Sequence, residues 1–186
     1  QDRAIQLSSA FIDESYPGNR SRVPSVVYVG LTRYYDDFTS YLLKKDKDNS
    51  KTLNRLVGEI ISDAGMRQLR LAETQKFRHV TSFFNGKSTT PFLKEDQVEV
   101  PSRFDPASFA EHPEMEAYNI VDKFIELTAS NSYQFILVNF ANGDMVGHTG
   151  SFDSAVKAVE ILDECVGKIV DRVLKCDGKV LITADH

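Results

Sequence analysis

Two apolar runs, each leading into an aspartate and a histidine, constrain the fold of this chain more than any other feature. Phe135–Val138 is apolar and rich in β-branched residues, and a polar segment carrying Asp144 and His148 follows it. Lys179–Thr183 is a second run of this kind, with Asp185–His186 just beyond it. We interpret both runs as buried strands that end in loops. Glycines in the first loop would let the backbone turn sharply enough to aim both side chains at one point.

The segment between the two runs predicts how they are arranged. Ser154–Leu174 is the clearest helix. Its apolar residues form one stripe, which consists of Val156, Val159, Leu162, Val166, Ile169 and Val173. We expect this stripe, and Cys165 beside it, to be part of the core. A strand, a helix and a strand in this order form a βαβ crossover, so the strands are parallel. Open α/β sheets bind ligands outside the carboxyl ends of such strands. The sequence therefore predicts a metal site with oxygen and nitrogen ligands at that edge.

The rest of the chain shows shorter periodic segments. Helical spacing of apolar residues occurs over residues 2–11, 53–61 and 115–127. Short strands are expected over residues 23–31, 68–72 and 98–100. The aromatic-rich segment 77–84 fits a helix or a strand.

A charged segment separates two apolar blocks. Residues 44–51, K-K-D-K-D-N-S-K, contain no apolar side chain, which makes them a candidate linker. We expect one domain over residues 1–45, a linker at 46–51 and a second domain over 52–186.

Composition and charge exclude several classes of function. A net charge of −5 gives no indication of the basic face that nucleic acid requires. No apolar run approaches the roughly 20 residues of a membrane span, so neither a nucleic acid nor a membrane is expected as a partner. The two cysteines, Cys165 and Cys176, lie in or beside a predicted helix, so we expect reduced thiols in a cytoplasmic protein.

Distinctive motifs are spread over the whole chain. They are N-F-A-N-G-D-M-V-G-H-T-G at 139–150, A-D-H at 184–186, D-R-A-I-Q-L at 2–7, R-Q-L-R-L-A-E-T-Q-K-F at 67–77, H-V-T-S-F-F-N-G at 79–86 and P-E-M-E-A-Y at 113–118. In these motifs the chain resembles the cofactor-independent phosphoglycerate mutases, members of the alkaline-phosphatase-like superfamily of two-metal enzymes.

The resemblance implies an α/β fold with a mostly parallel sheet flanked by helices, into which an α/β phosphotransferase domain is inserted. Residues 1–45 would be the C-terminal part of that inserted domain, and residues 52–186 would be part of the metal-binding, phosphatase-like domain. The chain begins at Gln1 without a methionine and stops directly after a predicted strand. We therefore expect an internal fragment of a longer enzyme.

The resemblance also implies two divalent metal ions. Asp144 and His148 would bind one ion together with a histidine beyond the end of the chain, and Asp185 and His186 would bind the other. Mixed oxygen and nitrogen ligands suit manganese, zinc or cobalt better than calcium. We expect manganese, with magnesium, cobalt and zinc as alternatives.

Two cations match residues that contact the substrate in the resembled family. Lys76, otherwise one more solvated lysine, matches a lysine that reaches the phosphoryl group and would stabilise its charge. Arg3 matches an arginine that grips the substrate phosphate, as a guanidinium does with two hydrogen bonds. We expect a packed His79 and an exposed His112, neither with a second metal ligand nearby.

The function implied is the interconversion of 3-phosphoglycerate and 2-phosphoglycerate through a phosphoserine intermediate, by a monomer whose partner is this small substrate. Ser8 and Ser9 lie in the wrong context to be the nucleophile, so we expect the fragment itself to be inactive. A metal-dependent phosphatase or sulfatase would share the metal ligands but would not need the D-R-A-I-Q-L segment. A phosphopentose mutase would carry a different inserted domain, and a non-catalytic metal-binding module is the alternative from another class.

Overall fold

The computed structural model describes residues 2–35, 37–43, 53–130 and 132–184. The chain divides into two compact units, Gln1–Thr52 and Leu53–His186. The predicted linker at 46–51 lies outside the described residues. That residues 1–45 belong to an inserted phosphotransferase domain stays a prediction.

In its described part, the first unit contains one helix, two short strands and a cluster of aromatic side chains. Helix α1 (Asp2–Ile12) confirms the helix expected over residues 2–11. Strands β1 (Gly30–Thr32) and β2 (Tyr41–Leu43) pair in parallel. The buried ring of Phe38 contacts four tyrosine rings, whose centroids lie 5.3–6.4 Å from its own: Tyr28, Tyr34, Tyr35 and Tyr41. These rings supply much of the apolar surface that a unit of this size can bury.

The second unit is built on a parallel sheet. In its described part the strands lie in the order β4 (Glu95–Val100), β3 (Gln68–Glu73) and β5 (Phe135–Asn139). Gln68 opens the central strand and pairs with the first residue of each neighbour, so the three strands start together and end within one residue of one another. Every residue of β3 is buried. The carboxyl ends of all three strands therefore form one edge.

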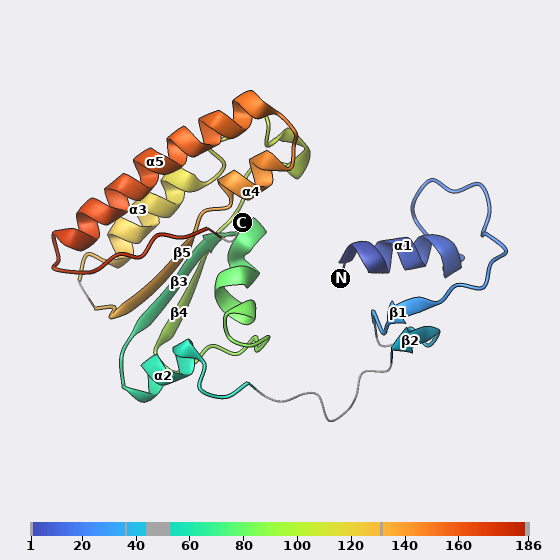
Figure 1. Cartoon of the computed structure of the whole chain (residues 1–186), viewed down its shortest axis with the longest axis horizontal. Helices are drawn as coiled ribbons and strands as arrows, with labels where there is room; N and C mark the ends of the chain where they lie inside the picture. Colours follow the sequence, from blue (N-terminus) through green and yellow to red (C-terminus); the bar gives the residue numbers. More distant parts are fainter. Residues whose placement is uncertain (1, 36, 44–52, 131, 185–186) are drawn as a thin grey trace. The chain divides into compact units, whose positions relative to one another are not determined.

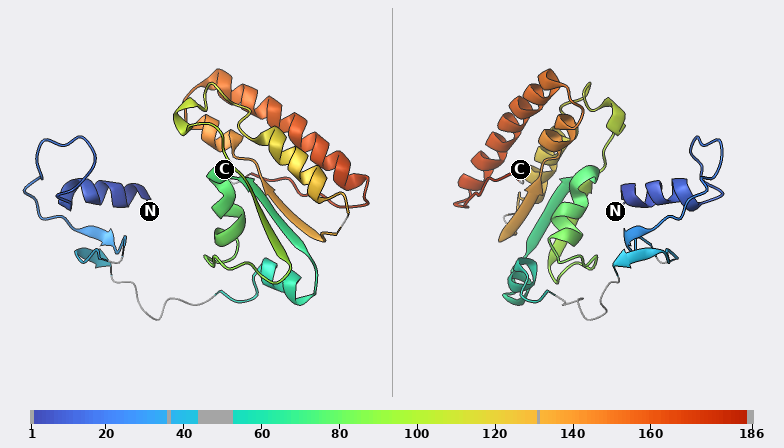
Figure 2. Two further views of the ribbon diagram at one scale, coloured as in Figure 1. Left: turned by 180° about the vertical axis from the view of Figure 1, so that it is seen from behind. Right: turned by 45° about the vertical axis from the view of Figure 1, so that its right-hand side comes forward.

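Helices cover both faces of this sheet (Figures 1 and 2). Helices α3 (Ala117–Leu127) and α5 (Phe152–Leu174) pack against each other on one side. The π-helical segment η3 (His79–Phe83) contacts β3 and β5 and lies on the other side. Helix α2 (Val57–Asp63) precedes the amino end of β3, and the short helix α4 (Asn142–Gly147) follows the carboxyl end of β5. The predicted α/β class, with a parallel sheet flanked by helices, is confirmed.

Alternating side chains of β3 serve the two faces of the sheet. Leu69 and Leu71 pack with Ile120 and Phe124 of α3 in the main apolar core. On the other face, the guanidinium of Arg70 is fully buried, lies over the rings of Phe84 and Phe135, and donates to the side chain of Gln68. It also lies 3.8 Å from the carboxylate of Glu95, so this buried cation has both a counter-charge and aromatic neighbours.

Most elements of the second unit agree with the sequence-based expectations. The strands β3, β4 and β5 and the helices α3 and α5 all form where apolar spacing predicted them. Helix α2 ends at Ala64, and Gly65 takes a φ of 74° directly after it, as expected for a helix terminator. Both thiols are free, and Cys165 is buried as expected. In the described part of the chain, no helix is long and apolar enough to cross a membrane.

The second predicted strand, Lys179–Thr183, is not formed. No described segment pairs with it, and the side chains of Val180, Leu181 and Ile182 are 39%, 91% and 66% exposed. Apolar residues form a strand only where a neighbouring strand satisfies their backbone hydrogen bonds. The strand predicted over residues 23–31 is wrong for the same reason. Only the last residues of this segment belong to β1, and Val27 is 94% exposed.

The predicted apolar stripe of the long helix is wrong only near its start. Val156 and Val159 are 43% and 60% exposed, although both were expected in the core. Ala158 is buried there instead, whereas Cys165 is buried as predicted and Ile169 and Val173 of the stripe pack against the main core. Helix α5 is apolar on more than one side, and spacing alone cannot decide which side meets the sheet.

The predicted loop after β5 is in fact helix α4, and Asp144 lies in its first turn. Gly143 and Gly147 are part of this helix, so neither makes the sharp turn expected of it. The left-handed conformation falls on Gly150, whose φ is 76°.

Candidate active site at the carboxyl edge of the sheet

Helix α4 brings together the first predicted pair of metal ligands. Asp144 and His148 are four residues apart, so they lie on one face of a helix, and Asp144 Oδ1 is 3.0 Å from His148 Nε2. The carboxylate is 16% exposed, whereas the imidazole is 71% exposed. A carboxylate oxygen and an imidazole nitrogen this close can bind the same cation, and this donor set suits a transition-metal ion.

Lys76, one of the two cations predicted to contact the substrate, lies against the same carboxylate. Lys76 ends the 3₁₀ turn η2 (Thr74–Lys76), which directly follows β3, and its side chain is buried. Its ammonium group forms an ion pair with Asp144 Oδ2. A buried ammonium is costly without a counter-charge, and Asp144 supplies that charge. The two oxygens of Asp144 therefore face two of the predicted site residues, Lys76 and His148.

Two buried polar side chains lie close in the sequence to this pair. The side chain of Asn142 is fully buried, and its Nδ2 donates to the carbonyl oxygens of Pro113 and Glu114 at 2.8 and 2.9 Å. Glu73 is fully buried at the end of β3 and accepts a hydrogen bond of 3.1 Å from the hydroxyl of Ser102. Both residues were missed as site residues, although each lies within a quoted motif.

Two buried carboxyl groups near this edge titrate differently. Burial raises the pKa of Glu73 to about 7, although the hydrogen bond from Ser102 opposes the shift. Burial also acts to raise the pKa of Glu116, but hydrogen bonds from Asn119 and Arg103 outweigh it and hold that pKa below its usual value. Glu116 is therefore ionised at neutral pH, with Arg103 as its counter-ion at 2.9 Å, whereas Glu73 is only partly ionised there.

Three buried acceptor atoms at this edge have no hydrogen-bond partner among the described residues. They are Glu73 Oε1, Asn139 Oδ1 and Asn142 Oδ1. They come from the last residue of β3, the last residue of β5 and the first residue of α4. Unpaired buried acceptors are uncommon and favour a bound cation, donor or water nearby. The residues present thus fit a cation-binding role.

The remaining predicted site residues are not placed. Asp185 and His186 lie outside the described residues. Arg3 is in α1, but its side chain is likewise not described. Within the described part of the chain, no three His, Cys, Asp or Glu side chains gather as a metal ion would require. The structure thus shows one half of the predicted constellation, Asp144 and His148 with Lys76.

Both expectations about the other histidines are wrong. His79 is exposed, and its ring meets the ring of Phe83 edge-on at 5.1 Å. His112 is half-buried and stacks on Phe104, with ring centroids 4.0 Å apart. The aromatic neighbour of His79 belongs to the aromatic-rich segment 77–84, whereas Phe104 lies eight residues before His112.

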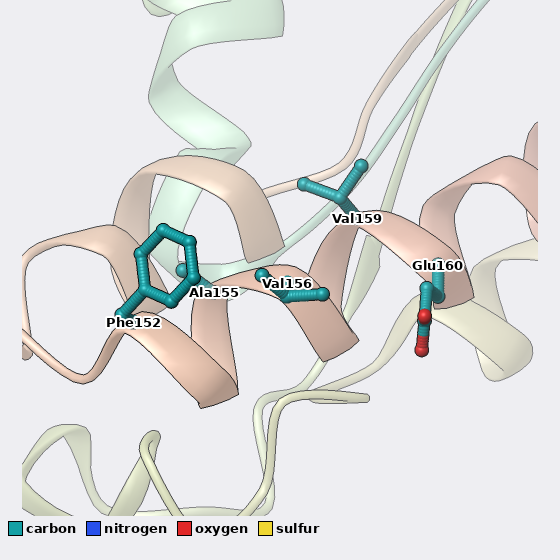
Figure 3. A pocket seen from close by; sticks show the side chains of 5 residues that line it. All are labelled: Phe152, Ala155, Val156, Val159 and Glu160. Atoms are coloured by element: carbon teal, nitrogen blue, oxygen red, sulfur yellow. The ribbon is translucent and has the colours of Figure 1, made fainter.

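A separate hollow lies along α5 and is apolar (Figure 3). One helix supplies all its lining residues, and none of the predicted site residues belongs to it; they are Phe152, Ala155, Val156, Val159 and Glu160. With Glu160 as its sole charged side chain, this hollow offers no chemistry comparable to that of the carboxyl edge.

The chain is similar to several known proteins. A family model described as the metalloenzyme superfamily matches residues 18–186. A 2,3-bisphosphoglycerate-independent phosphoglycerate mutase of Akkermansia muciniphila is 44% identical over 186 residues, which are 100% of this chain and 35% of that protein. The enzyme of the same name from Clostridium botulinum is 43% identical over 185 residues, covering 100% of this chain and 36% of the relative.

A solved structure shows the same fold. It is a phosphoglycerate mutase of Leishmania mexicana determined at low cobalt concentration, with a TM-score of 0.65 and 37% sequence identity. The match covers 90% of this chain and 30% of that one. The chain thus spans about a third of the length of the relatives that it matches.

Proposed function

The chain belongs to the metalloenzyme superfamily, and we propose that it is part of a phosphoglycerate mutase that interconverts 3-phosphoglycerate and 2-phosphoglycerate without a bisphosphoglycerate cofactor. The observation that supports this most is the ion pair between Lys76 and Asp144. It joins two motifs that are far apart in the sequence, at the sheet edge where α/β proteins bind their ligands. The names of the relatives supply the reaction.

In this proposal, Asp144 and His148 hold one divalent metal ion, and Asp185 and His186 hold a second. Manganese is the proposed metal, with magnesium, cobalt and zinc as alternatives. The ions, when bound, supply positive charge that activates the nucleophilic hydroxyl and stabilises the transferred phosphoryl group.

Lys76 contributes a fixed positive charge to the same phosphoryl group. Its ammonium is buried, and Asp144 holds it in place, so little reorganisation is needed when negative charge develops on the substrate. Arg3 is proposed to bind the substrate phosphate from the inserted domain. The substrate is a small phosphorylated acid, and the protein is proposed to act as a cytoplasmic monomer in glycolysis.

The test uses the complete protein that the gene encodes. We expect it to form 2-phosphoglycerate from 3-phosphoglycerate without added bisphosphoglycerate. The product is measured in an assay coupled to enolase. A chelator should abolish the activity, and manganese should restore it. Release of inorganic phosphate without any 2-phosphoglycerate would instead identify a metal-dependent phosphatase. Residues 1–186 alone should bind manganese weakly and show no turnover, because they span only about a third of the length of the relatives that they match.

A further inference from the structure

We infer that Asn142 is a positioning residue, whose buried amide fixes the helix that carries Asp144 and so sets the place of Asp144 relative to Lys76. The inference rests on the proposed function only in treating Asp144 as a metal ligand and Lys76 as the phosphoryl-binding cation. The inference concerns Nδ2 of Asn142, which donates to the carbonyls of Pro113 and Glu114, and not Oδ1, which has no partner among the described residues.

Helix α4 depends on contacts outside itself. It has six residues, and its N-cap, Ala141, offers no side-chain hydrogen bond to the first turn. A helix this short is not stable by itself. Both donor positions of the Asn142 amide are directed at the chain before α3, through the carbonyls of Pro113 and Glu114. Asn142 is two residues from Asp144, so this attachment fixes the first turn, where the carboxylate begins.

The same stretch of chain also holds the strand end that leads to Lys76. The hydroxyl of Ser102 donates to Glu73, and its backbone N–H donates to the hydroxyl of Thr74 at 3.1 Å. Thr74 is the first residue of the turn that ends in Lys76. The segment from Ser102 to Glu116 therefore binds the Lys76 turn at its beginning and the Asp144 helix near its end.

An internal contact ties the two ends of that segment together. The backbone N–H and the Nε of Arg103 both donate to Glu116 Oε1 at 2.9 Å. The hydroxyl of Ser154 adds a further bond from the start of α5 to the carbonyl of Ala110. The segment is thus a common support for both site elements, and Asn142 joins α4 to it by hydrogen bonds, beside the apolar contact of Val146.

Loss of this attachment should act on the site more than on the fold. A shift of about 1 Å in a positioned group can lower a rate by about a hundredfold. We therefore expect Asn142→Ala to lower kcat by about ten- to a hundredfold with KM little changed, and to weaken manganese binding by about tenfold or more, since an incorrectly placed first ligand binds less well.

Asn85→Ala is the matched control. Asn85 is also a buried asparagine whose Nδ2 makes two hydrogen bonds, to both oxygens of Glu95 at 2.9 and 3.0 Å. Glu95 is the first residue of β4, so this pair lies at the opposite, amino edge of the sheet. Its loss should lower the thermal unfolding temperature and leave manganese affinity and kcat within about twofold of wild type in samples kept below that temperature.

The experiment measures manganese affinity by direct titration, together with kcat, KM and thermal unfolding, for the complete protein. Asn142→Ser keeps one hydrogen-bond donor, so its manganese affinity and kcat should lie between those of wild type and Asn142→Ala. If Asn142→Ala does not fold, Asn142→Ser is used for the test instead. Unchanged affinity and kcat in the folded Asn142 variants would overturn the inference, as would equal losses in Asn85→Ala. A wild-type protein that binds manganese but lacks isomerase activity would refute the proposed function, and the affinities alone would then decide on Asn142.

Discussion

Lys76 and Asp144 form an ion pair across two elements of the second unit, one in the turn after β3 and the other in the first turn of α4. The second oxygen of Asp144 lies 3.0 Å from His148. One carboxylate therefore connects a buried cation with an exposed imidazole. If the two donors bind a metal ion as proposed, this arrangement places a fixed positive charge beside that ion, which suits phosphoryl transfer.

Substitution of Lys76 should separate charge stabilisation from metal binding. In the complete protein, Lys76→Ala should lower isomerase activity by about a hundredfold or more, because the phosphoryl charge loses a preorganised partner. Manganese content should stay near the wild-type level. The control is Lys168→Ala, since Lys168 is an exposed lysine paired with Glu164 on α5, and this variant should keep full activity. A Lys76→Ala enzyme with wild-type rates would exclude the proposed role.

Substitution of the two donors on α4 should reduce metal content as well as activity. His148→Ala should do so with little loss of stability, because its side chain is 71% exposed. Asp144→Ala should also lower the unfolding temperature, since the buried ammonium of Lys76 loses its counter-charge. Adding Lys76→Met to Asp144→Ala should restore part of that stability without restoring metal binding. Metal analysis and thermal unfolding check both points, and an Asp144→Ala protein that retains its metal would contradict them.

The buried carboxyl of Glu73 should make stability depend on pH. Its pKa is raised from 4.5 to about 7, so the folded state binds a proton more tightly than the unfolded state. Its contribution is fully present below about pH 4.5 and is lost as pH rises through about 7. The charged or polar groups that face it are Ser102 and Glu116.

Glu73→Gln should remove that dependence. A pKa shift of this size corresponds to at most about 3 kcal/mol. The difference between the free energies of unfolding of wild type and variant, measured with urea, should therefore change by up to that amount between pH 4.5 and 7. Parallel stability curves for the two proteins across this range would show that Glu73 ionises normally.

The two thiols should react at different rates. Cys165 is buried in α5, and burial raises its pKa, whereas Cys176 is exposed. Since the thiolate is the reactive form, iodoacetamide should modify Cys176 in the native protein and Cys165 only after denaturation. Mass spectrometry of the labelled peptides measures this, and rapid native labelling of Cys165 would be inconsistent with the packing of α5 against α3.

The central elements of the second unit were predictable from apolar periodicity alone. Strand β3 is buried along its length and α3 has one apolar face. The apolar pattern of each element is therefore compatible with only one way of packing. Periodicity failed where a segment could satisfy it in two ways. In the first turns of α5, Val156 and Val159 are exposed whereas Ala158 is buried, and contact with α4 selects Ala158.

The site was predictable in its residues but not in its local structure. Asp144, His148 and Lys76 were identified from motifs, and the structure brings them together. The glycines beside Asp144 indicated a loop because glycine disfavours helices, yet the amide of Asn142 and the burial of Val146 hold α4 in place. Glu73 went unnoticed because a single glutamate at the end of a strand is most often a surface residue.

Anomalous diffraction from crystals of the complete protein, grown with manganese and 3-phosphoglycerate, tests the proposed site most directly. The account predicts a manganese peak coordinated by Asp144 and His148, with the substrate phosphoryl group within hydrogen-bonding distance of Lys76 Nζ. A manganese ion bound elsewhere, with Asp144 and Lys76 still paired and the phosphoryl group remote from both, would contradict it.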